Sequence, residues 1–224
     1  MYHCVSIKAY QRLLKERFSL IGGTKFRLGS VEFDVSGKDG LGGLIEEWFG
    51  RWASSEGLAV YNPKLSGNSQ TFPDYFVGSN REGLLEVKTF DITASANFDI
   101  ANFQSYCESL SKNPERLDSD YLIFGYRLNG YDLIIENIWL KKIWEITCPS
   151  GKWPLKIQMK RGIIYNIRPA TWDSHNVQYP VFPNKEAFVS ALYETQKLYL
   201  KQPTTLEEQN YYYSVSRNST ERED

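Results

Sequence analysis

The sequence predicts an α/β fold, in which a mixed β-sheet is flanked by helices and continues into a C-terminal β-hairpin and helix. Two observations predict this class. Segments with apolar residues at helical spacing are interspersed along the chain with short runs typical of strands. In addition, the 224 residues are 42% hydrophobic and 24% charged, which is enough apolar material to bury a full core.

The first part of the chain is expected to begin with two helices separated by a hairpin. Residues 6–20 have an amphipathic pattern that stops at Gly22-Gly23, and the alternating stretch 25–35 suggests the hairpin. A second helix is expected over about 40–55, with Asp39 as its cap and Gly57 at its end. Its apolar residues recur at helical spacing: Leu41, Leu44, Ile45, Trp48 and Trp52.

Most of the predicted strands follow. Residues 58–62 read as a strand, and the turn-rich stretch 62–71 reads as a loop. Two short strands come next, at 72–77 and 84–90, joined by a glycine-containing turn. The remaining expected elements are a helix over 97–112, strands 120–128 and 131–140 around the turn Asn129-Gly130, a hairpin over 152–168 turning at Arg161-Gly162, and a helix over 184–201. Residues 203–224 are polar and are expected to be disordered.

Composition excludes several kinds of site. The cysteines, Cys4, Cys107 and Cys148, are odd in number and far apart, so they predict neither a disulfide framework nor a CxxC zinc site. The only histidines are His3 and His175, too few for histidine-based metal or Ser-His-Asp chemistry. No apolar run is long enough to cross a bilayer, and the first residues lack a signal-peptide layout. A cytoplasmic protein without a membrane partner is therefore expected.

The residues that indicate chemistry are Pro73-Asp74 and, separated from Asp74 by eleven residues, the triplet Glu86-Val87-Lys88. Side chains alternate between the faces of a strand, so Glu86 and Lys88 share a face and Val87 points away from it. If strands 72–77 and 84–90 pair around their turn, Asp74 lies opposite roughly Val87. Two carboxylates and one ammonium are then expected to converge.

Such a cluster fits a magnesium site. Adjacent carboxylates repel each other unless a cation lies nearby, and oxygen ligands with space for water suit Mg²⁺. Bound Mg²⁺ can polarise a phosphoryl oxygen and lower the pKa of a water, while Lys88 orients that water or offsets developing charge. The alternative is a solvated ion pair. Apolar neighbours (Leu84, Leu85 and Phe90) favour a buried strand, where unpaired charges are costly.

This pattern resembles the active-site signature of the PD-(D/E)xK nuclease superfamily, which includes most type II restriction endonucleases and archaeal-type Holliday junction resolvases. The similarity extends over about 40–128, because Gly43-Leu44-Ile45-Glu46 opens a helix that precedes a strand and a glycine-containing loop. The resemblance implies a restriction endonuclease-like core. It also implies Asp74 and Glu86 as Mg²⁺ ligands, the Val87 carbonyl as a further ligand, and Lys88 and Glu46 as supporting catalytic groups.

Glu47 is the alternative to Glu46, and apolar Phe49 and Ala53 at the +3 and +7 positions favour Glu46. On this interpretation residues 1–202 form a single nuclease-like domain, with its core at about 40–140 and a DNA-contact extension at about 141–202.

The C-terminal half is locally basic in a chain whose net charge is −1. From Leu140 to Trp172 there are seven lysines and arginines against Glu145 alone, interleaved with aromatic residues. Such a stripe can bind phosphates, and amides and arginines can read base edges. The alternative is a basic, solvated hairpin. The candidate DNA contacts are Gln158, Lys160, Arg161, Asn166 and Arg168.

The function that follows is Mg²⁺-dependent, site-specific cleavage of double-stranded DNA by a type II restriction endonuclease. Family resemblance further implies a homodimer on a symmetric site and a cognate DNA methyltransferase as system partner. Two alternatives remain open: a structure-selective repair or junction nuclease, and a non-catalytic DNA-binding module. A metabolic enzyme is disfavoured, because the chain has no glycine-rich phosphate motif or nucleophile elbow.

Overall fold

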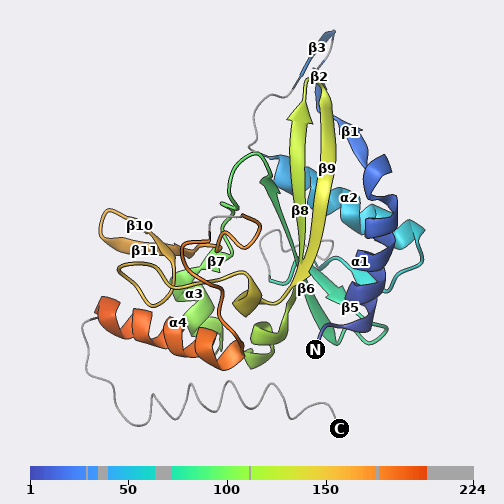
Figure 1. The fold of residues 1–224 in the computed structure, drawn as a ribbon. Helices are drawn as coiled ribbons and strands as arrows, with labels where there is room; N and C mark the ends of the chain where they lie inside the picture. Colours follow the sequence, from blue (N-terminus) through green and yellow to red (C-terminus); the bar gives the residue numbers. More distant parts are fainter. Residues whose placement is uncertain (29, 35–39, 64–71, 111, 175–176, 201–224) are drawn as a thin grey trace. The chain divides into compact units, whose positions relative to one another are not determined.

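The computed structural model describes residues 1–28, 30–34, 40–63, 72–110, 112–174 and 177–200 (Figure 1). These residues form two compact units, each assembled from separate stretches of the chain. The first unit contains Met1–Ser95 and Asp120–Lys141. The second contains Ala96–Ser119 and the described residues that follow Lys141. The predicted tail, 203–224, lies outside the described residues.

The first unit is built on a six-stranded mixed sheet with the order β1-β9-β8-β6-β5-β4. Neighbouring strands are antiparallel except β6 and β8, which run parallel. The strands are β1 (Ile21–Gly23), β4 (Val60–Tyr61), β5 (Tyr75–Val77), β6 (Gly83–Asp91), β8 (Asp120–Asn129) and β9 (Asp132–Lys141). A separate hairpin is formed by β2 (Lys25–Leu28) and β3 (Val31–Asp34).

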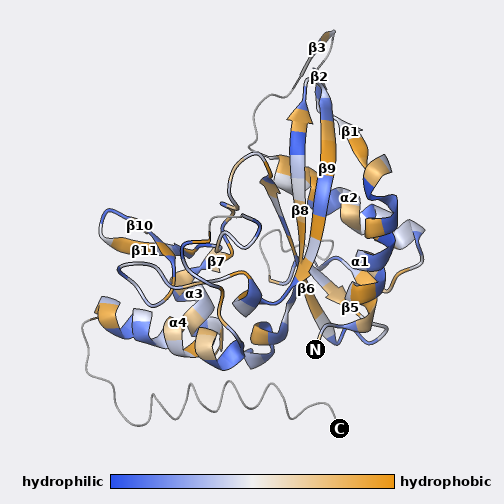
Figure 2. Ribbon diagram, in the orientation of Figure 1, coloured by the Kyte–Doolittle hydropathy of each residue, from blue (hydrophilic) through white to orange (hydrophobic). Residues whose placement is uncertain are grey.

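Two helices pack against this sheet and enclose the core of the first unit (Figures 1 and 2). They are α1 (Cys4–Glu16), which is followed by the 3-10 turn η1 (Arg17–Ser19), and α2 (Leu41–Ser55). Leu13 of α1, Phe49 of α2 and Leu85 of β6 are all buried in one apolar cluster. Because alternate residues of β6 point to opposite faces, burial of Leu85 and Val87 against the helices turns Glu86 and Lys88 to the other face.

The predicted architecture of a mixed sheet with flanking helices is confirmed, with local differences. Gly22 and Gly23 were expected to end a helix, but they belong to β1 and pair with β9. Helix α2 ends as expected, with Gly57 at φ +66°, a left-handed conformation that glycine adopts at little cost. At its other end Gly40 occupies the capping position, and the proposed cap Asp39 lies outside the described residues.

The second unit contains a three-stranded sheet in the order β10-β11-β7, together with two helices. Its elements are β7 (Ala101–Asn102), α3 (Phe103–Leu110), η3 (Pro114–Asp118), η4 (Ile143–Glu145), β10 (Ile157–Lys160), β11 (Ile163–Ile167) and α4 (Lys185–Leu200). Helices α3 and α4 meet through the rings of Tyr106 and Phe188, whose centroids are 6.2 Å apart. The helix predicted over 97–112 is shorter than expected, because residues 101–102 pair with β11 instead.

Both predicted hairpins are present, and the turn of the first is displaced by one residue. Asn129 belongs to β8 and pairs with Asp132 of β9, so that turn is Gly130-Tyr131 and not Asn129-Gly130, whereas β10 and β11 pair around Arg161-Gly162 as predicted. Both residues of the second turn have positive φ, +52° at Arg161 and +81° at Gly162, as tight hairpin turns require. None of the helices in the described ranges is long and apolar enough to span a membrane.

Candidate active site

Strands β5 and β6 form the hairpin that positions the candidate catalytic residues. Tyr75 pairs with Leu85, and Val77 pairs with Gly83. Continuing this register by one residue sets Asp74 level with Glu86. The predicted level, roughly Val87, was therefore wrong by one position. The prediction started the second strand at residue 84, whereas Gly83 already belongs to β6 and pairs with Val77. The expected convergence of the three side chains is nevertheless present.

Direct bonds hold the two carboxylates side by side. The backbone N–H of Asp74 donates to Glu86 Oε1 at 3.2 Å, and the backbone N–H of Val87 donates to Asp74 Oδ2 at 3.0 Å. Lys88 Nζ lies 2.8 Å from Glu86 Oε2 and 3.6 Å from Asp74 Oδ2. One ammonium is thus shared by two carboxylates, and the trio carries a formal charge of −1 when all three groups are ionised.

Burial makes this arrangement electrostatically strained. Asp74 and Glu86 are buried, with 8% and 6% of their surface exposed. Desolvation raises the pKa of Glu86, Lys88 opposes that rise, and the neighbouring Asp74 adds to it. Burial alone would lower the pKa of Lys88, but the charges of Glu86 and Asp74 outweigh it and raise that pKa above its ordinary value. Lys88 therefore stays protonated at neutral pH.

Glu46 and Glu47 are distinguished by their surroundings on α2. Glu47 is exposed and pairs with Arg51 one helical turn later, at 2.5 Å. Glu46 is half-buried, and its charge contributes to raising the pKa of Lys88. Its +3 and +7 neighbours, Phe49 and Ala53, are fully buried, as expected from the sequence. This environment favours Glu46 as the member of the pair that serves the site.

Sequence reasoning missed Tyr75 as the link between α2 and the cluster. Its hydroxyl donates to the backbone carbonyl of Glu46 at 2.7 Å, and its ring packs edge-on against Phe49. A Cβ built at Gly50 would lie only 2.5 Å from the Tyr75 hydroxyl oxygen, so glycine is needed at that turn of the helix. The available signal was strand alternation, which turns Tyr75 away from Asp74 and towards the helix layer.

The donor set of the cluster fits Mg²⁺. Proteins usually bind this ion through one or two carboxylates and leave waters on the remaining positions. Asp74 and Glu86 supply two such carboxylates, and within the described ranges the Lys88 ammonium lies close to both. Among the described residues no group of three or more His, Cys, Asp and Glu side chains is arranged to hold a metal ion. The fit therefore depends on these two carboxylates, with the Val87 carbonyl as the predicted further ligand.

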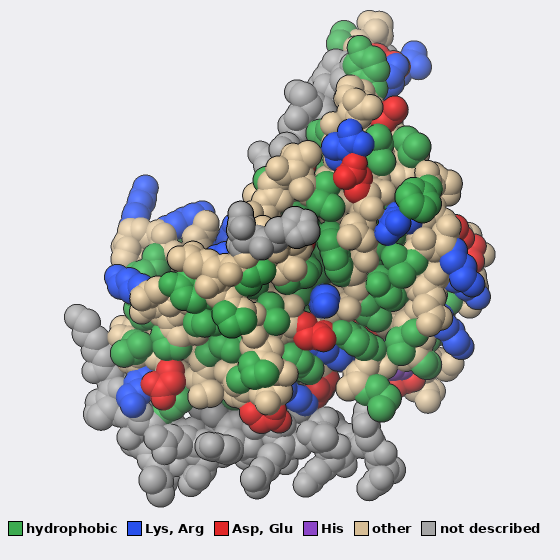
Figure 3. All heavy atoms as spheres, in the orientation of Figure 1, with side chains coloured by type: hydrophobic (Ala, Val, Ile, Leu, Met, Phe, Trp, Pro, Cys, Tyr) green, Lys and Arg blue, Asp and Glu red, His purple; other side chains and the backbone are tan. Residues whose placement is uncertain are grey.

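The predicted DNA contacts all lie in the second unit, on and beside the β10–β11 hairpin, from which lysine and arginine side chains project (Figure 3). Lys160 and Arg161 are exposed at its turn. Gln158 and Asn166 face each other across the two strands, and Asn166 Nδ2 donates to Gln158 Oε1 at 3.3 Å. Arg168 is engaged within the protein, because its guanidinium donates to the Asp99 carboxylate and the Asn97 carbonyl.

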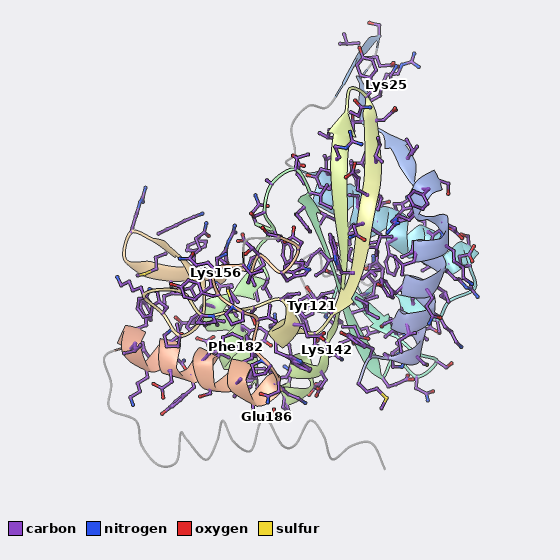
Figure 4. All side chains as sticks on the ribbon, in the orientation of Figure 1. Lys25, Tyr121, Lys142, Lys156, Phe182 and Glu186 are labelled. Carbon is purple, nitrogen blue, oxygen red and sulfur yellow. The ribbon has the colours of Figure 1, made fainter. Side chains whose placement is uncertain are left out.

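Other members of the basic stripe have structural partners as well. Lys142 is buried, with 4% of its surface exposed, and donates to the Asp118 carbonyl. Lys156 donates to the Pro169 carbonyl at 2.8 Å beside the start of the hairpin (Figure 4). The stripe counted along the sequence is therefore not one continuous cationic surface.

Comparison with known proteins identifies a family that spans nearly the whole chain. The model of the NgoBV restriction endonuclease family matches residues 3–219. The type II restriction enzyme NlaIV of Neisseria lactamica is 41% identical over 194 residues, which cover 83% of this chain and 78% of that enzyme. The type II restriction enzyme NgoBV of Neisseria gonorrhoeae is 34% identical over 166 residues, which cover 68% of this chain and 88% of that enzyme.

A solved structure agrees with these sequence matches. The NlaIV restriction endonuclease structure superposes with a TM-score of 0.80 at 35% identity, and the match covers 96% of this chain and 88% of that one. The family membership predicted from the Asp74, Glu86 and Lys88 pattern is thereby confirmed, and a restriction enzyme is favoured over a repair nuclease. The chain belongs to the NgoBV restriction endonuclease family, whose named members are type II site-specific DNA-cutting enzymes.

Proposed function

We propose that the protein is a Mg²⁺-dependent type II restriction endonuclease that hydrolyses phosphodiester bonds in double-stranded DNA at a specific site. Beyond family membership, one observation carries this proposal. The charged side chains of Asp74, Glu86 and Lys88 meet on a buried hairpin, where desolvating charged groups is costly, and such a cluster suits a cation and a phosphate.

The proposed roles follow from the contacts. Asp74 and Glu86 would hold the metal, together with the Val87 carbonyl. When bound there, Mg²⁺ supplies polarisation of a phosphoryl oxygen and acidification of water. Lys88 stays protonated beside both carboxylates, so it can donate a hydrogen bond that orients the attacking water or offsets the charge gathering on phosphate oxygens. Glu46 supports Lys88 and the waters around the carboxylates.

The test is a plasmid digest under three conditions: with Mg²⁺, with EDTA, and with Mg²⁺ added back in excess of the EDTA. Discrete fragments that require Mg²⁺, with ends that map to one short sequence, are the expected result. A smear or cutting restricted to branched DNA would contradict site-specific restriction. Tight DNA binding without any cutting would contradict the enzymatic assignment.

We also propose the wider setting implied by the family: a cytoplasmic homodimer acting beside a cognate DNA methyltransferase. In this proposal residues 1–202 act as one nuclease-like domain, whose DNA-contact extension at about 141–202 carries Gln158, Lys160, Arg161, Asn166 and Arg168. Sedimentation equilibrium tests the dimer, because the expected mass is twice that of one chain. If the protein sedimented as a monomer under conditions in which it cuts both strands, the proposed dimer would be contradicted.

A further inference from the structure

The three-stranded sheet of the second unit has one face turned to the interior and one turned outwards. Ile164 and Ile167 of β11 are buried and define the inner face. Gln158 pairs with Asn166, and Lys160 pairs with Ile163. Cross-strand partners point to the same side of a sheet, and Ile163 is 57% exposed, so these four residues mark the outer face.

A β-bulge adds Tyr165 to this outer face. Gln158 pairs with Asn166, yet the next residue, Met159, pairs with Ile164, so Tyr165 is the extra residue on its strand. Regular alternation would turn one of the neighbours Tyr165 and Asn166 inwards. Instead, Asn166 bonds the outward Gln158, and the Lys160 ammonium lies 4.9 Å from the centre of the Tyr165 ring, which is 47% exposed. The bulge therefore brings two consecutive side chains to the same surface.

Asn102 fixes the backbone of the bulge. It lies opposite Asn166 in the β7–β11 register, and its Nδ2 donates to the Tyr165 carbonyl at 3.1 Å. Its Oδ1 accepts from the backbone N–H of Ser105 at 3.0 Å, which caps the first turn of α3. One side chain thus ties the bulge to a helix, and the outward residues are held before any ligand arrives.

The chemistry of this face matches DNA better than it matches a protein surface. In the bond between Asn166 and Gln158, Asn166 donates and Gln158 accepts. The opposite ends of the two amides, the Gln158 nitrogen and the Asn166 oxygen, are a donor and an acceptor of the kind that reads base edges. Exposed Lys160 and Arg161 add positive charge at the hairpin turn, which is complementary to phosphates. A two-stranded β-ribbon also fits the major groove.

We propose that the outer face of the β10–β11 hairpin reads the DNA sequence, with Tyr165 as a specificity-determining contact beside the Gln158–Asn166 pair and Asn102 as the residue that positions it. This inference rests on the proposed function. It adds Tyr165 and Asn102 to the residues expected to affect recognition, and it assigns Arg168, held by Asp99 and Asn97, to bracing the hairpin rather than to reading bases.

The experiment measures discrimination rather than activity alone. The wild-type site is first mapped by sequencing the ends of digested DNA. Single-turnover cleavage rates are then compared for the mapped duplex and for duplexes that carry one base change at each position in turn. The discrimination ratio at a position is the rate on the mapped duplex divided by the rate on the duplex changed at that position. Tyr165→Ala and Asn166→Ala are expected to lower this ratio by about tenfold or more at one or more positions. Lys160→Ala is expected to weaken binding evenly and to lower the salt slope by about 1.

Two further variants separate recognition from folding. Asn102→Asp keeps the acceptor for Ser105 but loses the donor to Tyr165, so it should shift the discrimination ratio in the same direction while the melting temperature changes little. Tyr131→Ala is the matched control, because Tyr131 is also an exposed tyrosine beside a lysine, with Lys25 Nζ 5.9 Å from its ring centre. It should leave the ratio unchanged.

The outcomes are distinct. If the wild-type protein cuts no DNA, the proposed function itself fails. If the wild type cuts, and Tyr165→Ala and Asn166→Ala keep its ratio at every position, this inference alone is overturned. If Tyr165→Ala cuts nothing, the ratio of dissociation constants for matched and changed duplexes decides in the same way. Loss of a dimer in Tyr165→Ala with unchanged discrimination would assign the face to a second copy of the chain and overturn the proposal.

Discussion

Buried Glu86 shows most directly how the proposed function and stability oppose each other. Its carboxylate is desolvated and lies beside that of Asp74, and Lys88 relieves only part of the cost. Function near phosphates requires this group ionised, whereas folding favours it neutral. Residues that carry out chemistry are commonly less stabilising than alternatives at the same position.

This conflict predicts the behaviour of Glu86→Gln in EDTA. The folded pKa of Glu86 is raised, so its ionisation costs stability as the pH rises from its ordinary pKa towards the raised value. The uncharged amide avoids that cost and keeps an acceptor for Lys88. At pH 7 we therefore expect a melting temperature equal to that of the wild type or up to about 4 °C higher, with cleavage abolished.

The pH dependence is the control for this prediction. The difference in melting temperature between the variant and the wild type should shrink as the pH falls to the ordinary pKa of a glutamate and below it. There Glu86 becomes protonated in the unfolded wild-type protein as well as in the folded one. A variant that melts well below the wild type at pH 7 would show that the ionised carboxylate stabilises the fold.

Glu46 and Glu47 provide a matched pair on one helix. Glu46 is half-buried and acts on Lys88, whereas Glu47 is exposed and paired with Arg51. Residues that support metal ligands typically change activity tenfold to a hundredfold when they are replaced. We expect Glu46→Gln to lower the single-turnover cleavage rate by about that factor and Glu47→Gln to change it less than about twofold. Equal effects of the two substitutions would contradict this distinction.

At the scale of single residues, the sequence predicted those functional candidates whose residue type is itself unusual at its position. Glu86 and Lys88 stand out because charged residues between Leu85 and Phe90 are costly to bury, and Asp74 stands out because it follows Pro73 at hairpin distance from them. Tyr75 and Asn102 did not stand out, since their roles depend on which backbone groups the fold brings to their side chains. A count of basic residues likewise could not predict that Arg168 has partners within the protein.

At the scale of elements, helix α2 and strand β5 are in close contact at Gly50, where the missing side chain leaves room for Tyr75. Gly50 faces Tyr75, and a Cβ there would overlap the tyrosine ring, whereas a Cβ at Gly43 of the same helix would meet open space. Gly50→Ala should therefore cost about 1–3 kcal/mol through overpacking. Gly43→Ala should stabilise the helix by about 0.5–1 kcal/mol.

Chemical denaturation with both variants measures these free energies of unfolding. Because Tyr75 also bonds Glu46, Gly50→Ala should slow cleavage as well, while Gly43→Ala should not. If the two variants were equally stable, the close packing of α2 on β5 would be wrong.

Elements with strong local signals were predictable, and short ones were not. Gly130 and Arg161-Gly162 supply positive φ angles of the kind that hairpin turns require, so one turn was predicted at the correct residues and the other within one residue. Strands β1 and β7 contain three and two residues and exist through pairing with β9 and β11. Because their partner strands are distant along the chain, no local sequence pattern predicts these two strands.

Over the whole molecule, both units are assembled from stretches that are discontinuous in sequence. The first combines Met1–Ser95 with Asp120–Lys141, and the predicted DNA-contact extension shares the second with residues 96–119. Such assembly follows from long-range strand pairing, which composition and periodicity do not encode. Class, sheet type and the central hairpin were predictable, because each depends on patterns within a few dozen residues.

The most direct test of the whole account is the single-turnover cleavage rate of Lys88→Ala on a duplex that carries the mapped site, measured together with binding to the same duplex. We predict that cleavage falls by about a hundredfold to a thousandfold, the range seen when groups that stabilise developing charge are removed, because the Lys88 ammonium lies within 3.6 Å of both carboxylates. Binding should stay within about tenfold of wild type. Cleavage by Lys88→Ala at the wild-type rate would contradict the assignment of this cluster as the catalytic site.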